Sequence, residues 1–409
     1  MDFELPYTEE QEQFRTEVKA WIAENVPDDM RDTIDPEHFT EDMKQFWRGK
    51  HQEMAVKGWL YPTFPTEYGG GGLSGDHETI LQEEFRHARV PGNFTAPFVL
   101  PSLLVWGTEE QKQKFLVPLL KSTATAWQKF TEPSSGADLA NYESKAVREG
   151  DDWRLTGQNV FVSGVGKEPE YLYGPMMTDP DAPRHRNLGF FMIPVRDTAG
   201  NPTEGLEIRS QNLVNGGDQH FIFMDNVRLE SDHLIGGDHQ GWQVAQTSLE
   251  QEHGGRGNAF PDDVMVDHLL TWMQDKKDDN TDIQKQTAMD AYNDFRVDNI
   301  LAKRTYWMYS NKLSIQYEGN VANVHNREYQ CRNQIRVRDV MGPYAMLDGD
   351  DPRAPHQGEQ EVRQRALVGM RHAGGSTNIA RVVLARRIGI SRTQEKAAPT
   401  PSTATAGGS

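Results

Sequence analysis

The sequence predicts a mainly α-helical protein with a central β domain, in the order helical domain, antiparallel β-barrel or sandwich, and helical bundle. The spacing of apolar residues is helical to about residue 124, alternates over 125–238, and is helical again over 239–392. Turn residues separate the short β-rich runs of the middle region, as in antiparallel sheets. An α–β–α order of this kind is typical of a helical bundle packed against a β domain.

The first region, 1–124, shows helix start signals. Thr8 and Gln11 form a possible capping box, and apolar residues follow at helical spacing. Further helices are expected at 76–89 and at 108–120, where Thr108 is a candidate cap. We therefore predict an all-helical N-terminal domain.

The second region, 125–238, contains five β-rich runs bounded by Gly, Pro, Asn and Asp: "WRLTGQNVFVSG", "YLYGPMMTD", "NLGFFMIPV", "LEIRSQNL" and "QHFIFMDNVRL". The third region, 239–392, is predicted to form the C-terminal bundle. Residues 393–409 are small, polar and rich in Pro, Gly and Thr, so we expect a disordered tail.

Composition excludes several classes of protein. The 409 residues carry a formal net charge of −18, which argues against nucleic acid and anionic membranes as main partners. The single cysteine excludes an internal disulfide framework and a thiolate metal cluster. No pattern of His, Cys or acidic residues has metal-ligand spacing, and there is no Gly-x-Ser-x-Gly elbow. We expect neither a metalloenzyme nor a serine hydrolase.

We expect neither a targeting segment nor a membrane segment. Its acidic N-terminus is unlike a secretory or mitochondrial leader, and no run approaches the roughly 20 apolar residues that span a bilayer. We expect a soluble, cytoplasmic protein.

The stretch "QTSLEQEHGG", residues 246–255, places two glutamates in a predicted helix. Successive helical residues are about 100° apart, so Glu250 and Glu252 lie on nearly opposite faces. Trp242, Ala245 and Leu249 have the spacing of a buried stripe, and Glu252 is its next member. The pattern predicts that Glu250 faces solvent and that Glu252 is a buried carboxylate with a use.

Three further stretches are candidate ligand sites. The run "YGGGGLSG", 68–75, lacks the ending and context of a phosphate loop, so a turn between helices is preferred. The run "QKFTEPSSGADLA", 128–140, offers hydroxyls for a polar planar ligand or an anion, although an ordinary polar connection stays open. In "GGSTNIARVVLARRIG", 374–389, Ser376 or Thr377 can cap a helix.

Together these stretches resemble the acyl-CoA dehydrogenase family, in the family's order from about residue 5 to 392. The similar segments are "GTEEQKQKFLVPLL", "FTEPSSGADLA", "TGQNVFVSG", "MDNVRLESDHLIGG" with "GWQVA", and "GGSTNIARVVLARRIGISR". The resemblance implies that the C-terminal region is a four-helix bundle. It also implies an oxidoreductase of lipid and fatty acid metabolism that binds FAD between its domains. It implies removal of two hydrogens across Cα–Cβ of an acyl-CoA thioester, giving the trans-2-enoyl-CoA.

The resemblance also implies roles for individual residues. The cofactor contacts it implies, which orient and tune the flavin, are Gln128, Phe130, Thr131, Phe161, Val162, Ser163, Gly342, Ser376 and Asn378. The substrate contacts it implies are Ala137, His253 and Gly374.

Much of the family has its catalytic glutamate where this sequence has Gly374. A minority places the glutamate on the first bundle helix, and the matching residue here is Glu252. The resemblance therefore implies that Glu252 removes the α-proton as general base while N5 of FAD accepts the β-hydride. The Gly374 N–H would polarise the thioester oxygen.

Three positions depart from the family pattern. His253 stands for an Arg, Ala137 stands for a Ser, and no clear Arg-x-x-Phe-Gly follows the first bundle helix. The resemblance implies an electron transfer flavoprotein as acceptor and a homodimer or homotetramer. Two other readings stay open: a same-fold flavoenzyme with desulfinase, oxidase or monooxygenase chemistry, and a catalytically silent FAD-binding assembly protein.

Overall fold

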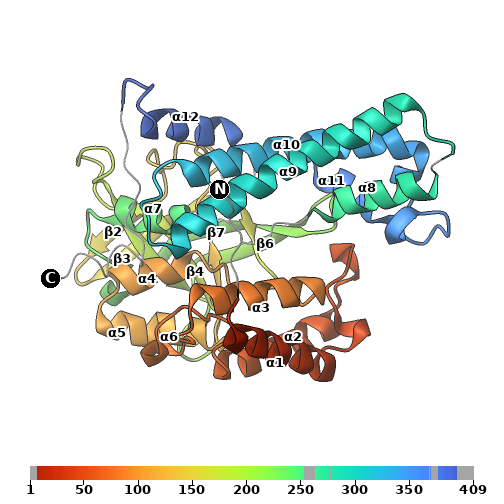
Figure 1. Ribbon diagram of the computed structural model, residues 1–409. Helices are drawn as coiled ribbons and strands as arrows, with labels where there is room; N and C mark the ends of the chain where they lie inside the picture. The colour runs from red at the N-terminus through yellow and green to blue at the C-terminus, as the bar shows by residue number, and fades with distance from the viewer. Residues whose placement is uncertain (1–6, 253–262, 277, 368, 370–375, 394–409) are drawn as a thin grey trace.

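The computed structural model describes residues 7–252, 263–276, 278–367, 369 and 376–393, and of Gln251 and Glu252 it describes the backbone alone. Figure 1 shows a helical N-terminal region, a β-sheet in the middle and long C-terminal helices on the opposite side of the sheet. The predicted α–β–α order is thus confirmed. Of the predicted tail, 393–409, the residues from 394 onward lie outside the described residues.

The N-terminal region is helical, as predicted. The capping boxes at Thr8 with Gln11 and at Thr108 with Gln111 are both present. The last helical stretch is broken by one π-helical turn, η4, over Lys112–Leu116. The α-helices are α1 (Glu9–Asn25), α2 (Glu41–Val56), α3 (Gly75–His87), α4 (Val99–Trp106), α5 (Glu109–Gln111) and α6 (Val117–Leu120).

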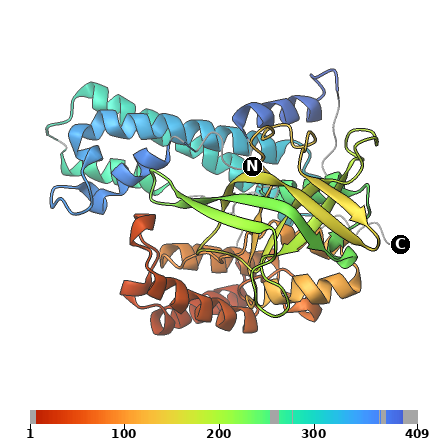
Figure 2. The same ribbon diagram turned by 180° about the vertical axis from the view of Figure 1, so that it is seen from behind.

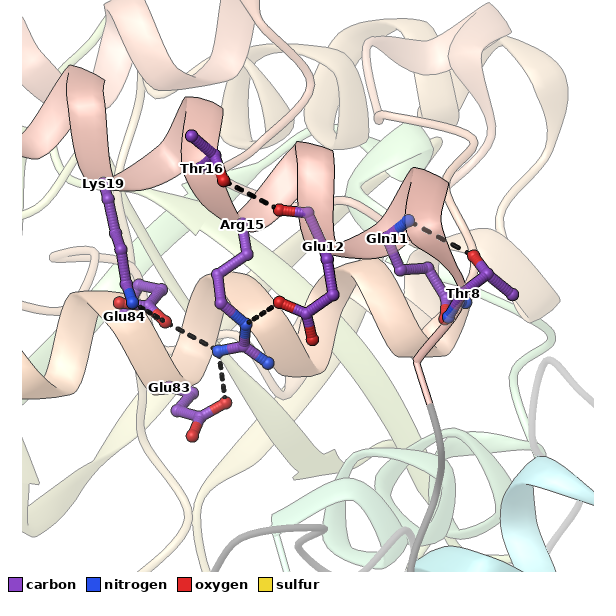
Figure 3. Close-up of polar contacts among 8 residues, drawn as sticks. All are labelled: Thr8, Gln11, Glu12, Arg15, Thr16, Lys19, Glu83 and Glu84. Atoms are coloured by element: carbon purple, nitrogen blue, oxygen red, sulfur yellow. Dashed lines mark hydrogen bonds and ion pairs between the residues drawn. The ribbon is translucent and has the colours of Figure 1, made fainter.

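Arg15 ties α1 to α3. Its guanidinium lies 2.7 Å from Glu83 and 2.6 Å from Glu84 of α3, and 3.2 Å from Glu12 of its own helix (Figure 3). The side chain is 13 % exposed, so these carboxylates offset the cost of removing its charge from water. The two helices are therefore held in one register.

The glycine run after Tyr68 is a packed turn. The N–H groups of Gly70, Gly71 and Gly72 donate to the carbonyls of Pro65, Tyr61 and Phe64 at 2.9–3.1 Å. A Cβ on Gly71 would lie 2.2 Å from the Gly58 carbonyl oxygen, so only glycine fits there. Because these donors are already bonded, they cannot cradle a phosphate.

The middle region is one eight-stranded sheet. Figures 1 and 2 show it from opposite sides, between the N-terminal and the C-terminal helices. All five predicted runs are strands, but the prediction of a purely antiparallel domain is wrong: β4 pairs in parallel with β1 and β2. The strand order is β6-β7-β3-β2-β4-β5-β8, with β1 beside β4. The strands are β1 (Ala126–Gln128), β2 (Lys145–Glu149), β3 (Asp152–Ser163), β4 (Tyr171–Met177), β5 (Leu188–Pro194), β6 (Leu206–Asn212), β7 (Asp218–Leu229) and β8 (Leu234–Ile235).

The helical spacing returns at Gly241, as predicted. The first helix, α7, packs on α4 and β5, where a Cβ on Gly241 would lie 2.4 Å from the backbone of Gly189. The helices are α7 (Gly241–Glu252), α8 (Val264–Asp275), α9 (Asp282–Ser310), α10 (Glu318–Met341), α11 (Glu359–Ala366) and α12 (Thr377–Arg387). Residues outside α-helices separate α9 from α10 at 311–317 and α10 from α11 at 342–358.

The core has a large apolar cluster in which one face of the sheet packs against α4, η4, α6 and α7, and α4 and α7 also contact each other. This cluster fixes α7 relative to β1 and β4. It therefore positions β1, which leads to the predicted cofactor residues, and α7, which carries the predicted base. None of the described helices is both long and apolar enough to cross a membrane.

Lys129 is an exception to the apolar core. Its side chain is fully buried, and its ammonium donates to the Pro175 carbonyl at 3.2 Å and lies over the Tyr142 ring. Burial lowers the pKa of this ammonium from 10.5 to about 7, although the carboxylate of Glu132 opposes the shift. The fold thus carries a destabilising group next to its first strand.

The substitution Lys129→Met tests how much the buried ammonium destabilises the folded protein. Below its folded-state pKa of about 7, the ammonium is charged in both the folded and the unfolded protein, so folding bears the full free-energy cost of burying the charge. Above pH 10.5 the amine is neutral in both states, and this cost is absent. Wild-type stability should therefore rise with pH through this window, and at pH 7 the variant should gain on the order of 4 kcal/mol in unfolding free energy. Urea unfolding at pH 7 and pH 9.5 measures both.

The exposed Lys145→Met, on neighbouring β2, is the control and should change stability little at either pH. A stability difference between wild type and Lys129→Met that is the same at both pH values would contradict the prediction.

Candidate active site

The predicted cofactor residues Gln128 to Thr131 lie at the end of β1, where it leaves the sheet. Phe130 is buried and packs edge-on against Tyr173, so only its backbone can meet a ligand. Gln128 is half-buried, and its amide oxygen accepts from the Tyr173 hydroxyl at 2.9 Å. Thr131 is half-buried, and its hydroxyl has no hydrogen-bond partner among the described residues.

A bulge in β3 lies beside Thr131. The Thr131 carbonyl accepts from the N–H of Val160 at 2.9 Å and from the Asn159 amide at 3.2 Å. The register of β3 against β7 shifts between Asn159 and Val162, and within this bulge Phe161 has a φ of +58°. That φ is strained for a phenylalanine, and it leaves the ring 60 % exposed.

Phe161, Val162 and Ser163 alternate along this strand. Val162 is buried in the sheet core, whereas Ser163 is exposed on the same side as Phe161. A Cβ on Gly164 would lie 2.0 Å from the Trp127 ring, so the strand ends in close contact with β1. Phe161 and Ser163 are therefore exposed on one side of β3, close to the point where Val160 bonds to the Thr131 carbonyl, while Val162 can offer only its backbone.

The turn after Thr131 is more closed than the sequence indicated. The Glu132 N–H and the Ser135 N–H each bond to the other residue's carbonyl, and the buried Ser135 hydroxyl donates to the Asp138 carbonyl. The Ser135 hydroxyl is thus already bonded. Ala137 is exposed at the tip, beside the ion pair of Asp138 with Arg184 from the β4–β5 turn.

In α7, the expected position of Glu250 is wrong. Its side chain is only 17 % exposed, and it pairs with Arg387 of α12. The periodicity identified the face that meets the sheet, where Ala245 is fully buried, but a second face of α7 meets α12. Glu252 ends α7; its side chain lies outside the described residues. All atoms of His253 and Gly374 lie outside the described residues.

The remaining cofactor candidates lie in the bundle. Ser376 caps α12, accepting from the Ile379 N–H at 3.3 Å, and Asn378 is exposed in the first turn. Gly342 follows α10 with a φ of +60° and open space where a Cβ would lie. It is close to α8 and η6 (Gly342–Met346), at the other end of α10 from the residues that contact Arg387. One chain therefore does not bring Gly342 to the sheet group.

Sequence reasoning missed the buried polar groups behind β1. Glu132 accepts from the N–H groups of Glu143 and Ser144 at 2.6 and 2.7 Å, and the Tyr142 hydroxyl donates to the Lys129 carbonyl at 2.8 Å. The only available signal was a lysine inside an otherwise buried strand, which a single sequence cannot distinguish from an edge position.

Comparison with known proteins identifies the family. A profile of the acyl-CoA dehydrogenase N-terminal domain matches residues 8–123. Acyl-CoA dehydrogenase FadE26 of Mycobacterium tuberculosis is 24 % identical over 393 residues, which cover 93 % of this chain and 96 % of that protein. The chain belongs to the acyl-CoA dehydrogenase family. Acyl-CoA dehydrogenase IpdE1 of Mycolicibacterium smegmatis is 30 % identical over 265 residues, covering 60 % of this chain and 65 % of that relative.

Solved structures of acyl-CoA dehydrogenases share the fold. The Tcur3481-Tcur3483 steroid ACAD has a TM-score of 0.80 at 24 % identity, covering 97 % of this chain and all of that chain. The ChsE4-ChsE5 complex from Mycobacterium tuberculosis has a TM-score of 0.78 at 23 % identity, covering 95 % and 100 %. The relatives are flavoprotein oxidoreductases, and a further structural neighbour is an FAD-dependent dehydrogenase.

The residues on β1 and β3 suit a flavin. A planar heteroaromatic ring needs both apolar contact and polar edge contacts. This part of the sheet offers the exposed ring of Phe161, the exposed Ser163 and the Thr131 hydroxyl, which has no bond to another described residue. Thr131, Phe161 and Ser163 can supply these with their side chains, and Phe130 and Val162 with their backbone.

Phe161→Gly tests this surface. Glycine relieves the left-handed backbone, so apoprotein stability should rise by up to about 1 kcal/mol. Loss of the ring should weaken FAD binding about tenfold. Thermal unfolding of the apoprotein and fluorescence titration with FAD measure the two effects.

Asn226→Gly is the matched control, because Asn226 has a φ of +55° in β7 of the same sheet. It should leave FAD affinity unchanged. An unchanged FAD affinity in Phe161→Gly would show that the exposed ring is not part of the flavin site.

Proposed function

We propose that the protein catalyses FAD-dependent α,β-dehydrogenation of an acyl-CoA thioester, with Glu252 as the base. The observation that carries this is the exposure of Phe161 and Ser163 on β3, close to the bonded carbonyl of Thr131, on a sheet that α7 meets through the shared apolar cluster. Bound FAD would supply the hydride acceptor.

The position of Glu252 supports its role as base. Ala245 and Ser248 of α7 are fully buried, and Glu252 follows them by seven and four residues. Residues at these spacings share a helix face. Removal of a thioester α-proton needs a general base whose basicity is raised by desolvation, and Glu252 is the residue that we propose for it.

The substrate we propose is a bulky acyl-CoA, with steroid-derived side chains as the first class to test. Support comes from the steroid ACAD whose fold covers 97 % of this chain. The glutamate on the first bundle helix agrees with this by family association. Electrons would leave to an electron transfer flavoprotein.

The proposed assembly is an oligomer of acyl-CoA dehydrogenase-type subunits. The sequence suggested a homodimer or homotetramer, but two structural neighbours carry two-component names, ChsE4-ChsE5 and Tcur3481-Tcur3483. Gly342 lies away from the sheet group within one chain, so its predicted cofactor contact needs a second subunit.

One structural neighbour supports oxidase function as the alternative. It is the prolyl acyl carrier protein oxidase AnaB, with a TM-score of 0.73 at 21 % identity. The two reactions differ in whether oxygen reoxidises the flavin. Oxygen consumption with acyl-CoA alone distinguishes them: a dehydrogenase consumes little without an added electron acceptor.

Anaerobic flavin bleaching tests the proposal. Short, long, branched and steroid-side-chain acyl-CoAs are added in turn to the FAD-loaded protein, and the visible flavin absorption is followed. We expect bleaching by bulky thioesters, and in Glu252→Gln a rate at least about 100-fold lower because the amide cannot take the proton.

Glu361→Gln is the control, because Glu361 pairs with Arg365 on α11, far along the bundle from α7 (Figure 1). Its bleaching rate should equal that of the wild type. If no thioester bleaches the wild-type flavin, the activity is wrong; if Glu252→Gln bleaches as fast as the wild type, another residue is the base.

A further inference from the structure

Lys129 is a buried cation that the proposed reaction does not use. Its side chain is fully buried, and among the described residues its ammonium has one hydrogen-bond acceptor, the Pro175 carbonyl at 3.2 Å. The centroid of the Tyr142 ring lies 5.6 Å from the ammonium. Burying a cation with so few partners costs free energy, and groups of this kind are more frequent at functional sites than elsewhere.

The charged group next to Lys129 is the buried carboxylate of Glu132. This carboxylate accepts from the N–H groups of Glu143 and Ser144 at 2.6 and 2.7 Å, which holds it in place. With the ammonium protonated, the charges of Lys129 and Glu132 sum to zero. With the amine neutral, one negative charge remains in this part of the core.

Hydrogen bonds connect Lys129 to both strands of the proposed flavin site. The Tyr142 hydroxyl donates to the Lys129 carbonyl at 2.8 Å and accepts from the Asn159 amide at 3.1 Å. The same amide donates to the Thr131 carbonyl at 3.2 Å. Thr131 follows Lys129 by two residues, and Phe161 follows Asn159 by two. The buried cation therefore lies directly behind the residues proposed to meet the flavin.

Close packing fixes the position of Lys129. Its N–H donates to the Tyr173 carbonyl at 2.8 Å, and a Cβ on Gly174 would lie 2.5 Å from its carbonyl oxygen. The end of β1 thus contacts β4 with no room for a side chain between them. The charge of Lys129 cannot move away from Thr131 without breaking these contacts.

We propose that the Lys129 ammonium stabilises the negative charge that a flavin at Thr131 and Phe161 gains on reduction, and so raises the midpoint potential of the bound cofactor. This inference rests on the proposed function. The oxidised flavin ring is neutral, and uptake of two electrons and one proton leaves it with one negative charge. A fixed cation behind the ring favours that charge, because the protein interior screens it weakly. Lys129 does not touch the ring; it acts through its field.

The effect depends on pH, because the buried ammonium can lose its proton. Burial lowers the pKa of Lys129 to about 7, and the carboxylate of Glu132 opposes the shift. Burial and Glu132 together raise the pKa of Tyr142, so this phenol stays neutral. The remaining neighbours are uncharged or exposed to solvent: Pro175, Asn159, Glu143 and Lys145. The field of the Lys129 ammonium is therefore present at pH 6 and absent at pH 9.5.

The test compares the FAD-loaded wild type and Lys129→Met at these two pH values. Each protein is reduced with dithionite in the presence of a redox dye, and no acyl-CoA takes part. At pH 6 the ratio of reduced to oxidised flavin at a given dye potential should be about tenfold lower in Lys129→Met, which is about 30 mV for a two-electron couple. At pH 9.5 the two proteins should agree. Lys129→Gln removes the charge but keeps a donor, and it gives the same test if Lys129→Met does not fold.

The exposed Lys145→Met, on neighbouring β2, is the matched control. Solvent screens its charge, so its ratio should equal that of the wild type at both pH values. Equal ratios in the wild type and Lys129→Met at pH 6, or a difference that persists at pH 9.5, would overturn the role of Lys129. The bleaching by acyl-CoA, and with it the proposed function, would stay intact. A wild-type protein that binds no FAD would overturn both.

Discussion

The backbone groups of Lys129 and Thr131 need hydrogen-bond partners at the point where β1 leaves the sheet. The position of the candidate site depends on which strands supply these partners. The Lys129 N–H donates to the Tyr173 carbonyl at 2.8 Å, and the Thr131 carbonyl accepts from Val160 and Asn159 of β3. Buried backbone groups left without partners would cost roughly 1–3 kcal/mol each. This requirement holds β1 between β4 and β3.

The hydrogen bonding of the Thr131 carbonyl explains the strained backbone of Phe161. Because the Val160 N–H donates to the Thr131 carbonyl, it is not available for pairing with β7, and the bulge at this point contains the exposed Phe161. The Asn159 amide also bonds the Tyr142 hydroxyl at 3.1 Å, which links the bulge to the buried polar groups behind β1. The open surface is thus a consequence of backbone bonding rather than of the exposed side chains alone.

The sequence predicted the order of elements well because each depends on local patterns. The caps at Thr8 and Thr108 and the five β-rich runs need only their neighbours in the chain. The parallel pairs of β4 could not be predicted, because pairing between distant strands leaves no local trace in a buried run.

The candidate site was predicted in part for the same reason. The motif positions Thr131, Phe161 and Ser163 were found through resemblance and stay predictions as cofactor contacts; the structure links β3 to Thr131 through the Val160 N–H. The position of Glu250 was predicted wrongly because periodicity shows which face of a helix is apolar, and α12 covers a second face with a charged pair. Polar partners that come from a distant helix have no periodic signal.

The central claim is that the surface on β1 and β3 holds the flavin and that the end of α7 supplies the base. The most direct test is an experimental structure of the protein with FAD and an unreactive acyl-CoA analogue. We expect the flavin ring against Thr131 and Phe161, with the Glu252 carboxylate within about 3 Å of the thioester α-carbon's proton. A flavin bound elsewhere, or another carboxylate at the α-carbon, would contradict the account.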